Sequence, residues 1–203
     1  MLADPGPDGE HHHHRHTGHR WLDVVLGVSA VTISLMSLFL AIQHGRVMEK
    51  MVEASTWPSM MVGYSTGNPD GTRHITIWAT NKGVGPARLD SLEVFHEGVA
   101  QSDPQGLLKA ILKPTDPSRH FPVIESDVLD NVFAPKDWVN FVDLDPKSYD
   151  QDDYARIQHA LSGLQFRVCY CSVFEECWAL DTRKSPRAVA TKACAVPPKM
   201  FLH

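Results

Sequence analysis

The sequence lacks the features that mark several large classes of protein. Its 203 residues hold 19 Lys and Arg against 24 Asp and Glu, so the positive charge of a general nucleic-acid binder is missing. Four Cys are too few for a small disulfide-dense scaffold. No stretch matches a phosphate-binding loop or a dinucleotide-binding fingerprint. With 43% hydrophobic and 21% charged residues, the composition also excludes a disordered, collagen-like or multi-pass membrane protein.

The first 20 residues are polar and show no apolar periodicity, so residues 1–20 are expected to form a disordered, His-rich tail. Half of the 12 His lie in this segment: His11, His12, His13, His14, His16 and His19. Imidazoles at this density can chelate a divalent metal, but no spacing for a fixed coordination geometry accompanies them. We therefore predict no metal site and no cofactor here, and a low-complexity tail or a tag remnant explains the tract.

One long apolar run stands out. Residues 24–42 form 19 consecutive positions without a charge, enough for a helix rising ~1.5 Å per residue to cross a ~30 Å hydrocarbon core. A cleaved signal peptide would need a shorter run and a small-residue cleavage site, which Phe39-Leu40-Ala41 does not supply. We predict a single transmembrane anchor over residues 21–43 and a juxtamembrane stalk helix over residues 44–56.

Small residues recur along the predicted anchor at spacings of three and four, and so share one face of the helix. They are Gly27, Ala30, Ser34, Ser37 and Ala41. Such a seam allows two helices to approach closely in lipid, which predicts a parallel homodimer through the anchor. The alternative is that small residues are common in transmembrane helices whether or not the helices associate.

Beyond Trp57-Pro58, short apolar segments separated by turn residues predict β-strands. The expected strands cover residues 59–64, 74–80, 88–96, 138–143, 164–172 and 177–181. Asp103-Pro104 predicts the start of a helix through Leu112, and Ser148-x-x-Gln151 predicts a capping box for a second helix.

The expected fold class is mainly β. The N-terminal transmembrane helix is followed by an antiparallel Ig-like β-sandwich over residues 57–182, with one or two inserted helices. Residues 183–203 hold five basic residues and no acidic ones, and are expected to form a basic C-terminal tail. Such a tail could meet anionic lipid or an acidic partner, or fold back on the acidic stretch of its own domain.

Three patterns that can signal catalysis or metal binding have simpler explanations. Gly63–Gly67 fits G-x-S-x-G, but the turn Asn68-Pro69-Asp70-Gly71 cannot begin the helix that a hydrolase nucleophile elbow requires. The acidic residues between Asp116 and Asp153 lack the EF-hand spacing and are expected to form a solvated face. No catalytic, cofactor or metal site is predicted from the scattered His74, His96, His120 and His159.

The cysteines carry most information about the compartment. Cys169 and Cys171 share one face of a predicted strand, and a five-residue loop places Cys171 opposite Cys177. Of three possible connectivities we favour Cys171–Cys177 with Cys169–Cys194, the alternatives being a Cys₄ zinc site or free thiols. Disulfides need an oxidising compartment, which predicts a periplasmic domain and a cytoplasmic N-terminus at a bacterial inner membrane.

Three segments together resemble a group of bacterial single-pass membrane proteins. They are the anchor followed by Trp57-Pro58, the N-x-G-x-G-P-A turn of residues 81–87, and the C-x-C-x₅-C-W run of residues 169–178. The resemblance implies a membrane anchor and a β-rich domain. No activity is assigned to the group, so no catalytic residue is carried over.

We therefore expect a non-enzymatic binding or assembly module of the bacterial cell envelope, with an unknown envelope protein as partner. An exposed aromatic patch would favour this function. The alternative is a metal-binding sensor or an enzyme, with a Cys site or a His/carboxylate site. A pocket that joins His96 or His120 to Asp127, Asp130 or Asp143 would favour the alternative.

Overall fold

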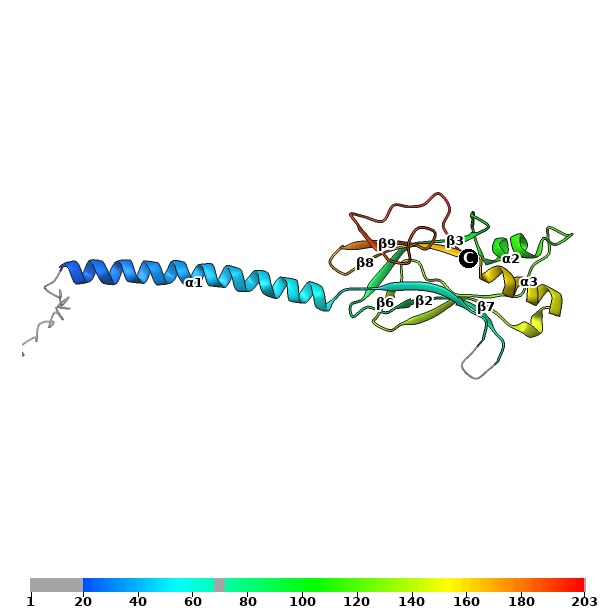
Figure 1. The fold of residues 1–203 in the computed structure, drawn as a ribbon, viewed down its shortest axis with the longest axis horizontal. Helices are drawn as coiled ribbons and strands as arrows, with labels where there is room; N and C mark the ends of the chain where they lie inside the picture. Colours follow the sequence, from blue (N-terminus) through cyan, green and yellow to red (C-terminus); the bar gives the residue numbers. More distant parts are fainter. Residues whose placement is uncertain (1–19, 68–71, 203) are drawn as a thin grey trace, which may run out of the picture. The chain divides into compact units, whose positions relative to one another are not determined.

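The structure is a computed structural model and describes residues 20–67 and 72–202 (Figure 1). It divides into two compact units, Met1–Met51 and Val52–His203, which are considered separately. The His-rich segment and the turn Asn68–Gly71 lie outside the described residues, so the predictions made for them stay predictions.

Helix α1 spans Arg20–Ser55 in 36 residues without a break. The segments predicted as anchor and stalk therefore form one continuous helix. Among the described residues it is the one helix that is long and apolar enough to cross a membrane. It ends shortly before Trp57-Pro58, because a proline disfavours the helical conformation of the residue that precedes it.

The five small residues of the predicted seam all lie in α1 and are exposed in the single chain. The hydroxyl of Ser34 donates a hydrogen bond of 2.8 Å to the carbonyl of Ala30, one turn earlier. A hydroxyl that is satisfied within its own helix is compatible with a lipid environment, where no water competes for it. The homodimer through this seam stays a prediction.

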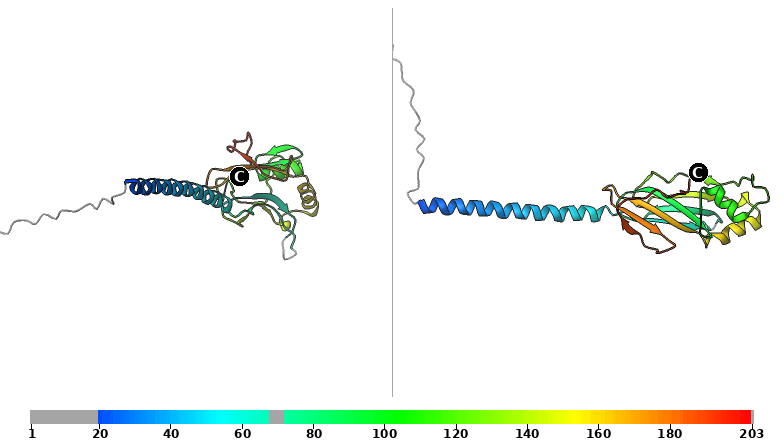
Figure 2. Two further views of the ribbon diagram at one scale, coloured as in Figure 1. Left: turned by 60° about the vertical axis from the view of Figure 1, so that its left-hand side comes forward. Right: turned by 90° about the horizontal axis from the view of Figure 1, so that it is seen from above.

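The second unit contains two antiparallel sheets that lie as two layers (Figures 1 and 2). The four-stranded sheet has the order β1 (Met60–Ser65), β2 (Ile75–Asn81), β7 (Trp138–Leu144) and β5 (Ile124–Glu125). The six-stranded sheet has the order β10 (Val189–Thr191), β9 (Cys177–Asp181), β8 (Gln165–Cys171), β3 (Ala87–His96) and β4 (Val99–Gln101), with β6 (Val132–Phe133) also paired to β3.

Both sheets contribute to one hydrophobic core. Ile75 and Ile77 of β2 face it from one layer, and Leu92 of β3 and Val168 of β8 face it from the other. A helix followed by antiparallel sheets is therefore confirmed as the fold class, and each of the six predicted strands is present within one residue of its expected ends. The short strands β4, β5, β6 and β10 were not predicted, since two or three residues are too few to show alternation.

Helix α2 (Pro104–Leu112) begins as predicted, with the side chain of Asp103 accepting a 2.6 Å hydrogen bond from the N–H of Gly106. Helix α3 (Gln151–Leu161) corrects the second helix prediction. Asp150, not Ser148, caps it by accepting from the N–H of Asp153, because Ser148 ends a short 3₁₀ turn. The two helices lie side by side at one end of the sheets (Figure 2).

The C-terminal segment is part of the domain and not a separate basic tail. Strand β10 pairs with β9, and further on Phe201 is buried in the shared core. The N–H of Phe201 donates to the carbonyl of Leu92 at 2.8 Å, and that of Leu202 to the carbonyl of Ser102 at 2.7 Å. The segment therefore packs on the six-stranded sheet, held by backbone hydrogen bonds and apolar burial.

The side-chain amide of Asn81 is fully buried. It connects the beginning of β1 to the turn of residues 81–87 and to strand β6. Its Oδ1 accepts hydrogen bonds from the N–H groups of Ser59 (3.2 Å) and Gly83 (2.9 Å). Its Nδ2 donates to the carbonyls of Gly85 (2.7 Å) and Phe133 (3.0 Å). All four hydrogen bonds that a side-chain amide can make are therefore formed inside the protein.

The glycines of the same turn allow the chain leaving α1 to pass very close. A Cβ atom at Gly83 would collide with the carbonyl of Trp57, and one at Gly85 with the backbone of Thr56. The N–H groups of Val84 and Gly85 both donate to the Trp57 carbonyl, at 3.0 and 3.2 Å. The N-x-G-x-G-P-A turn and Trp57-Pro58 are thus two halves of one junction.

Replacing Asn81 tests this junction. Asn81→Ala leaves two buried carbonyls and two N–H groups without their partner, so we expect the free energy of unfolding to fall by about 3 kcal/mol or more. The measurement is urea unfolding of the full chain in detergent, followed by tryptophan fluorescence. Asn131→Ala is the control, because Asn131 is exposed and makes one hydrogen bond, to the Asp127 carbonyl. Equal losses in the two variants would contradict the account.

Candidate functional site

A groove of about 480 Å³ lies between strand β1 and strands β8 and β9. Met60, Met61 and Val62 form one wall, and Trp178 and Leu180 are among the residues of the other. The segment Pro186–Ala188, which leads into β10, completes the lining. One wall therefore belongs to the four-stranded sheet and the other to the six-stranded sheet.

The wall formed by β1 is an unpaired sheet edge. Ser59 and Lys82 lie opposite each other and are joined by a 2.8 Å bond from the Lys82 N–H to the Ser59 carbonyl. In an antiparallel pair such bonded positions alternate with positions whose backbone groups point away. The N–H and C=O groups of Val62 and Tyr64 therefore point away from β2. No strand of the described chain pairs with this side of β1, which we call the free edge.

The free edge lacks the charges, prolines and bulges that usually protect an exposed strand against pairing. Natural proteins shield exposed edges with charges, prolines, bulges or covering segments. The sequence of β1, Met-Met-Val-Gly-Tyr-Ser, has neither a charge nor a proline, and its register with β2 is regular over all six residues. An uncharged edge of this length is able to accept a further strand.

Stacked aromatic rings also line the groove. The ring centroids of Trp57 and Trp178 are 5.9 Å apart, and those of Tyr170 and Trp178 are 5.8 Å apart. Trp57 is 58% exposed, so the stack runs from solvent to the buried Tyr170. Burial raises the pKa of the Tyr170 hydroxyl, and a hydrogen bond from the backbone of Met60 offsets this in part. That bond links β1 to β8 at the base of the groove.

One cation lines the groove. Arg187 is exposed, and within residues 20–67 and 72–202 no carboxylate forms an ion pair with its guanidinium. Most other arginines of the domain have such partners. A guanidinium of this kind is suited to a carboxylate supplied by a bound molecule, because it offers a planar, bidentate donor pair.

A second aromatic cluster covers the outer face of the four-stranded sheet. The rings of Trp78 and Trp138 lie 4.2 Å apart, and the Nζ of Lys82 is 5.6 Å from the Trp138 ring. The indole N–H of Trp138 donates to Asn140 at 2.8 Å. Gly63 of β1 leaves room for Trp78, whose ring a Cβ atom there would strike. The aromatic patch that would favour a binding module is thus present on the strands next to the free edge.

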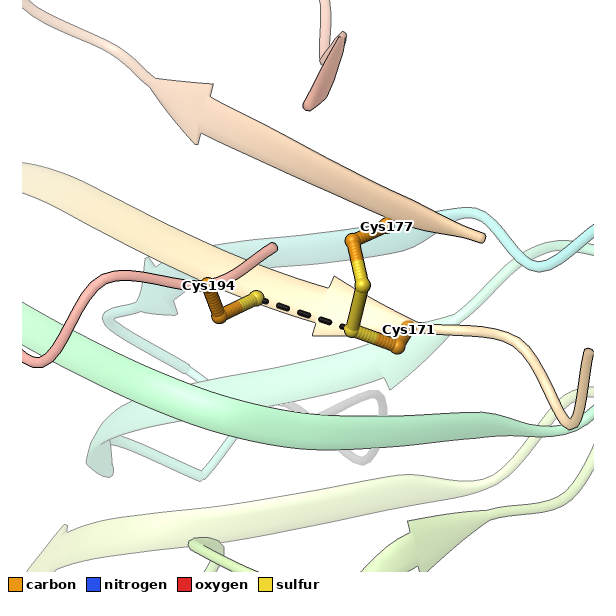
Figure 3. A group of neighbouring side chains, drawn as sticks. All are labelled: Cys171, Cys177 and Cys194. Carbon is orange, nitrogen blue, oxygen red and sulfur yellow. Dashed lines mark hydrogen bonds between the residues drawn. A yellow bond between two sulfur atoms is a disulfide. The ribbon is translucent and has the colours of Figure 1, made fainter. Parts of the chain in front are cut away.

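The four cysteines form two disulfides, Cys171–Cys177 and Cys169–Cys194, and none of them is free. This is the pairing that the sequence analysis favours. The Sγ atoms of Cys171, Cys177 and Cys194 lie within 4.8 Å of one another, close enough for metal ligands (Figure 3). Zinc binds thiolates, however, and sulfurs joined in disulfides do not fit that donor set. This geometry therefore suits disulfides, not the zinc alternative.

The histidines and carboxylates of the enzyme alternative are not brought together. Asp127 and Asp130 line a shallow pocket without a histidine, and Asp143 Oδ1 lies 2.6 Å from Nδ1 of His74. His96 lines a different pocket, beside α3. Within residues 20–67 and 72–202, the cysteine group is the one cluster with metal-ligand spacing.

The other chemical patterns have structural roles. Ser65 of the G-x-S-x-G match ends β1, and its hydroxyl donates to the Gly67 carbonyl at 2.8 Å. In the acidic stretch, Asp145 and Asp150 cap the 3₁₀ turn and α3. Asp153 forms an ion pair of 3.3 Å with Arg119. These carboxylates therefore have structural partners within the domain.

A line of charged side chains crosses the six-stranded sheet. Arg167 lies 2.9 Å from Glu93 and 3.3 Å from Asp181, and Arg183 lies 2.8 Å from Asp181. The hydrogen bond from Arg183 is the main cause that lowers the pKa of Asp181. Because each charge has a partner of opposite sign, this network stabilises the sheet and leaves no group free for a ligand.

Comparison of the chain with protein-family models, with curated proteins and with solved structures gives no match. The candidate site therefore rests on the geometry of this chain alone.

Sequence reasoning identified the cysteines but missed the groove. The absence of charge in β1 was a usable signal, but which side of a strand stays unpaired depends on contacts between segments distant in sequence. Trp57, Trp178 and Arg187 are brought together in the same way, by the two sheets and the C-terminal segment.

The charged line predicts a defined pH dependence. A carboxyl whose pKa is lowered by folding stabilises the protein above its unfolded pKa of about 3.9, and this contribution is lost as the pH falls through the folded pKa. Asp181→Asn should therefore lower stability at neutral pH, and its difference from wild type should shrink below about pH 4.

The measurement is urea unfolding of both proteins between pH 7 and pH 3. Glu97→Gln is the control, since Glu97 is exposed. A difference between wild type and Asp181→Asn that stays constant down to pH 3 would show that the ion pairs do not stabilise the sheet.

Proposed function

We propose that this chain is a membrane-anchored, non-enzymatic binding module of the bacterial cell envelope. It binds an extended segment of another envelope protein along the free edge of β1. One observation carries the proposal: the unpaired backbone groups of Val62 lie beside a groove lined by aromatic rings and an unpaired guanidinium.

Strand addition is the binding mode that these features support. The incoming segment forms main-chain hydrogen bonds with β1, and its alternate side chains point into the groove toward Trp178 and Leu180. An acidic side chain of the segment pairs with Arg187. The chemistry of the partner is therefore an extended peptide with apolar residues at alternate positions and at least one carboxylate.

The proposed location of the module is supported by α1 and the disulfides. We propose that α1 anchors the chain in the inner membrane, with the N-terminus in the cytoplasm and the sheets in the periplasm. The length and apolar character of α1 support the anchor. The two disulfides support an oxidising compartment for the domain.

We further propose that the domain is Ig-like. The strand order supports this: β1-β2-β7-β5 follows the immunoglobulin order A-B-E-D, and β9-β8-β3-β4 follows G-F-C-C′. Helix α3 then occupies the connection between strands E and F. The disulfides depart from the antibody pattern, since they lie within one sheet and its C-terminal segment and do not bridge the two sheets.

The resemblance to bacterial single-pass membrane proteins is likewise proposed as a true relationship. The segments that carry it have connected structural roles in this chain, which supports it. The turn of residues 81–87 donates two hydrogen bonds to the carbonyl of Trp57. The segment of residues 169–178 contains Trp178, whose ring stacks on that of Trp57.

The test is selection from a phage-displayed library of random 12-residue peptides on the full chain in lipid nanodiscs, with Val62→Pro as the counter-selection. Proline removes the N–H that points to the free edge, and an edge strand tolerates this loss. We expect enriched peptides with alternating apolar residues and an acidic residue. Their affinity should fall at least about tenfold on Val62→Pro, through one lost hydrogen bond and a clash with the proline ring.

Two controls make the selection specific. Val62→Thr keeps the backbone N–H and should retain binding, and Arg187→Ala should remove the preference for an acidic residue but keep the alternating pattern. If no peptide is enriched over the counter-selection, or if enriched peptides bind Val62→Pro as well as wild type, the proposed function is wrong.

A further inference from the structure

The two disulfides touch each other. Cys194 is bonded to Cys169, yet its Sγ also lies 3.7 Å from the Sγ of Cys171, which is bonded to Cys177 (Figure 3). Cys169 and Cys171 are two residues apart on β8, so both side chains point from the same face of the strand. The C-terminal segment thus presents one sulfur to two possible partners.

We propose that these sulfurs form a thiol–disulfide exchange site, whose substrate is an exported dithiol reductant. When the reductant opens the Cys171–Cys177 disulfide, the disulfide partner of Cys194 changes from Cys169 to Cys171. The attacking and attacked sulfurs are already in contact, so the distance between them permits exchange through a thiolate. Neither sulfur needs a movement of the strands to reach the other.

The surroundings of Cys171 hold its sulfur in place. Oδ2 of Asp90 lies 3.3 Å from it, and Arg88 forms an ion pair of 2.7 Å with the same carboxylate. A disulfide sulfur has no proton to donate, so this contact becomes a hydrogen bond only after reduction. The arginine compensates the negative charge beside the sulfur. Cys194 is the half-buried member of the group and the other three are buried.

The reductant is a dithiol, which supplies two electrons and two protons as it forms its own disulfide. One of its thiolates attacks Cys177 Sγ, the Cys171–Cys177 bond breaks, and Cys171 leaves as a thiolate. Cys171 attacks Cys194, which forms Cys171–Cys194, breaks Cys169–Cys194 and leaves Cys169 as a thiolate that takes a proton. The second thiol of the reductant displaces Cys177, so the reductant leaves as a disulfide and the protein keeps one disulfide and two thiols.

The exchange moves the attachment of the C-terminal segment. Because Cys194 Sγ already lies 3.7 Å from Cys171 Sγ, the change of partner needs only a small shift of the segment. Arg187 lies between β9 and Cys194, so this shift acts on the wall of the groove that contains Arg187. This consequence for binding rests on the proposed function, whereas the exchange itself does not.

The decisive variant is Cys177→Ser in the full chain purified in detergent. It leaves Cys171 as the odd thiol beside an intact Cys169–Cys194 disulfide. After incubation at pH 8, acid quenching and alkylation, tandem mass spectrometry separates label on Cys169 from label on Cys171. We expect at least about a tenth of the molecules to carry the label on Cys169. Label confined to Cys171 would overturn the proposal.

Cys171→Ser is the matched control, because it removes the same disulfide but leaves Cys177, on the other strand, as the odd thiol. Its label should stay on Cys177. Wild type treated with limiting dithiothreitol gives a second reading that does not depend on a variant folding. The expected product carries label on Cys169 and Cys177 in one molecule, and label on Cys171 and Cys177 would contradict it. Neither outcome alters the peptide selection with Val62→Pro, so the two proposals fail separately.

Discussion

The buried amide of Asn81 is the constraint on which the arrangement of the domain depends. It fixes the start of β1 against the turn of residues 81–87 and against β6. The glycines of that turn allow the backbone of Thr56 and Trp57 to pass at a distance that a Cβ atom would prevent. Because β1 is held on one side by β2 and at its start by this junction, its other side is left open toward β8 and β9.

An uncharged, unpaired sheet edge promotes aggregation, because any extended chain can pair with it. Natural proteins therefore protect such edges unless they serve in binding. In this domain the edge is bordered by an aromatic stack and by Arg187, which is why we propose a strand with apolar side chains and a carboxylate as its ligand. The disulfides act on the opposite wall. They cross-link the β8–β9 hairpin and the C-terminal segment, whose residues form this wall of the groove.

Most of the elements could be predicted from local sequence, and the site could not. Strong signals such as the charge-free run of α1, the alternation in β2 and the Asp103-Pro104 cap act within a few residues. The capping of α3 was misassigned because Ser148 and Asp150 both suit an N-cap, and the preceding 3₁₀ turn decides between them. The groove brings residues 57–62 together with residues 170–188, and one sequence carries no signal for such a contact.

We propose that the disulfide-bonded domain is anchored in the inner membrane and faces the periplasm. The direct measurement is labelling of intact bacterial cells that produce the full chain with a maleimide that cannot cross the inner membrane, with and without reductant. The account predicts no labelling before reduction and labelling of intact cells after it. Labelling that needs cell lysis but no reductant would place reduced cysteines in the cytoplasm and contradict the account.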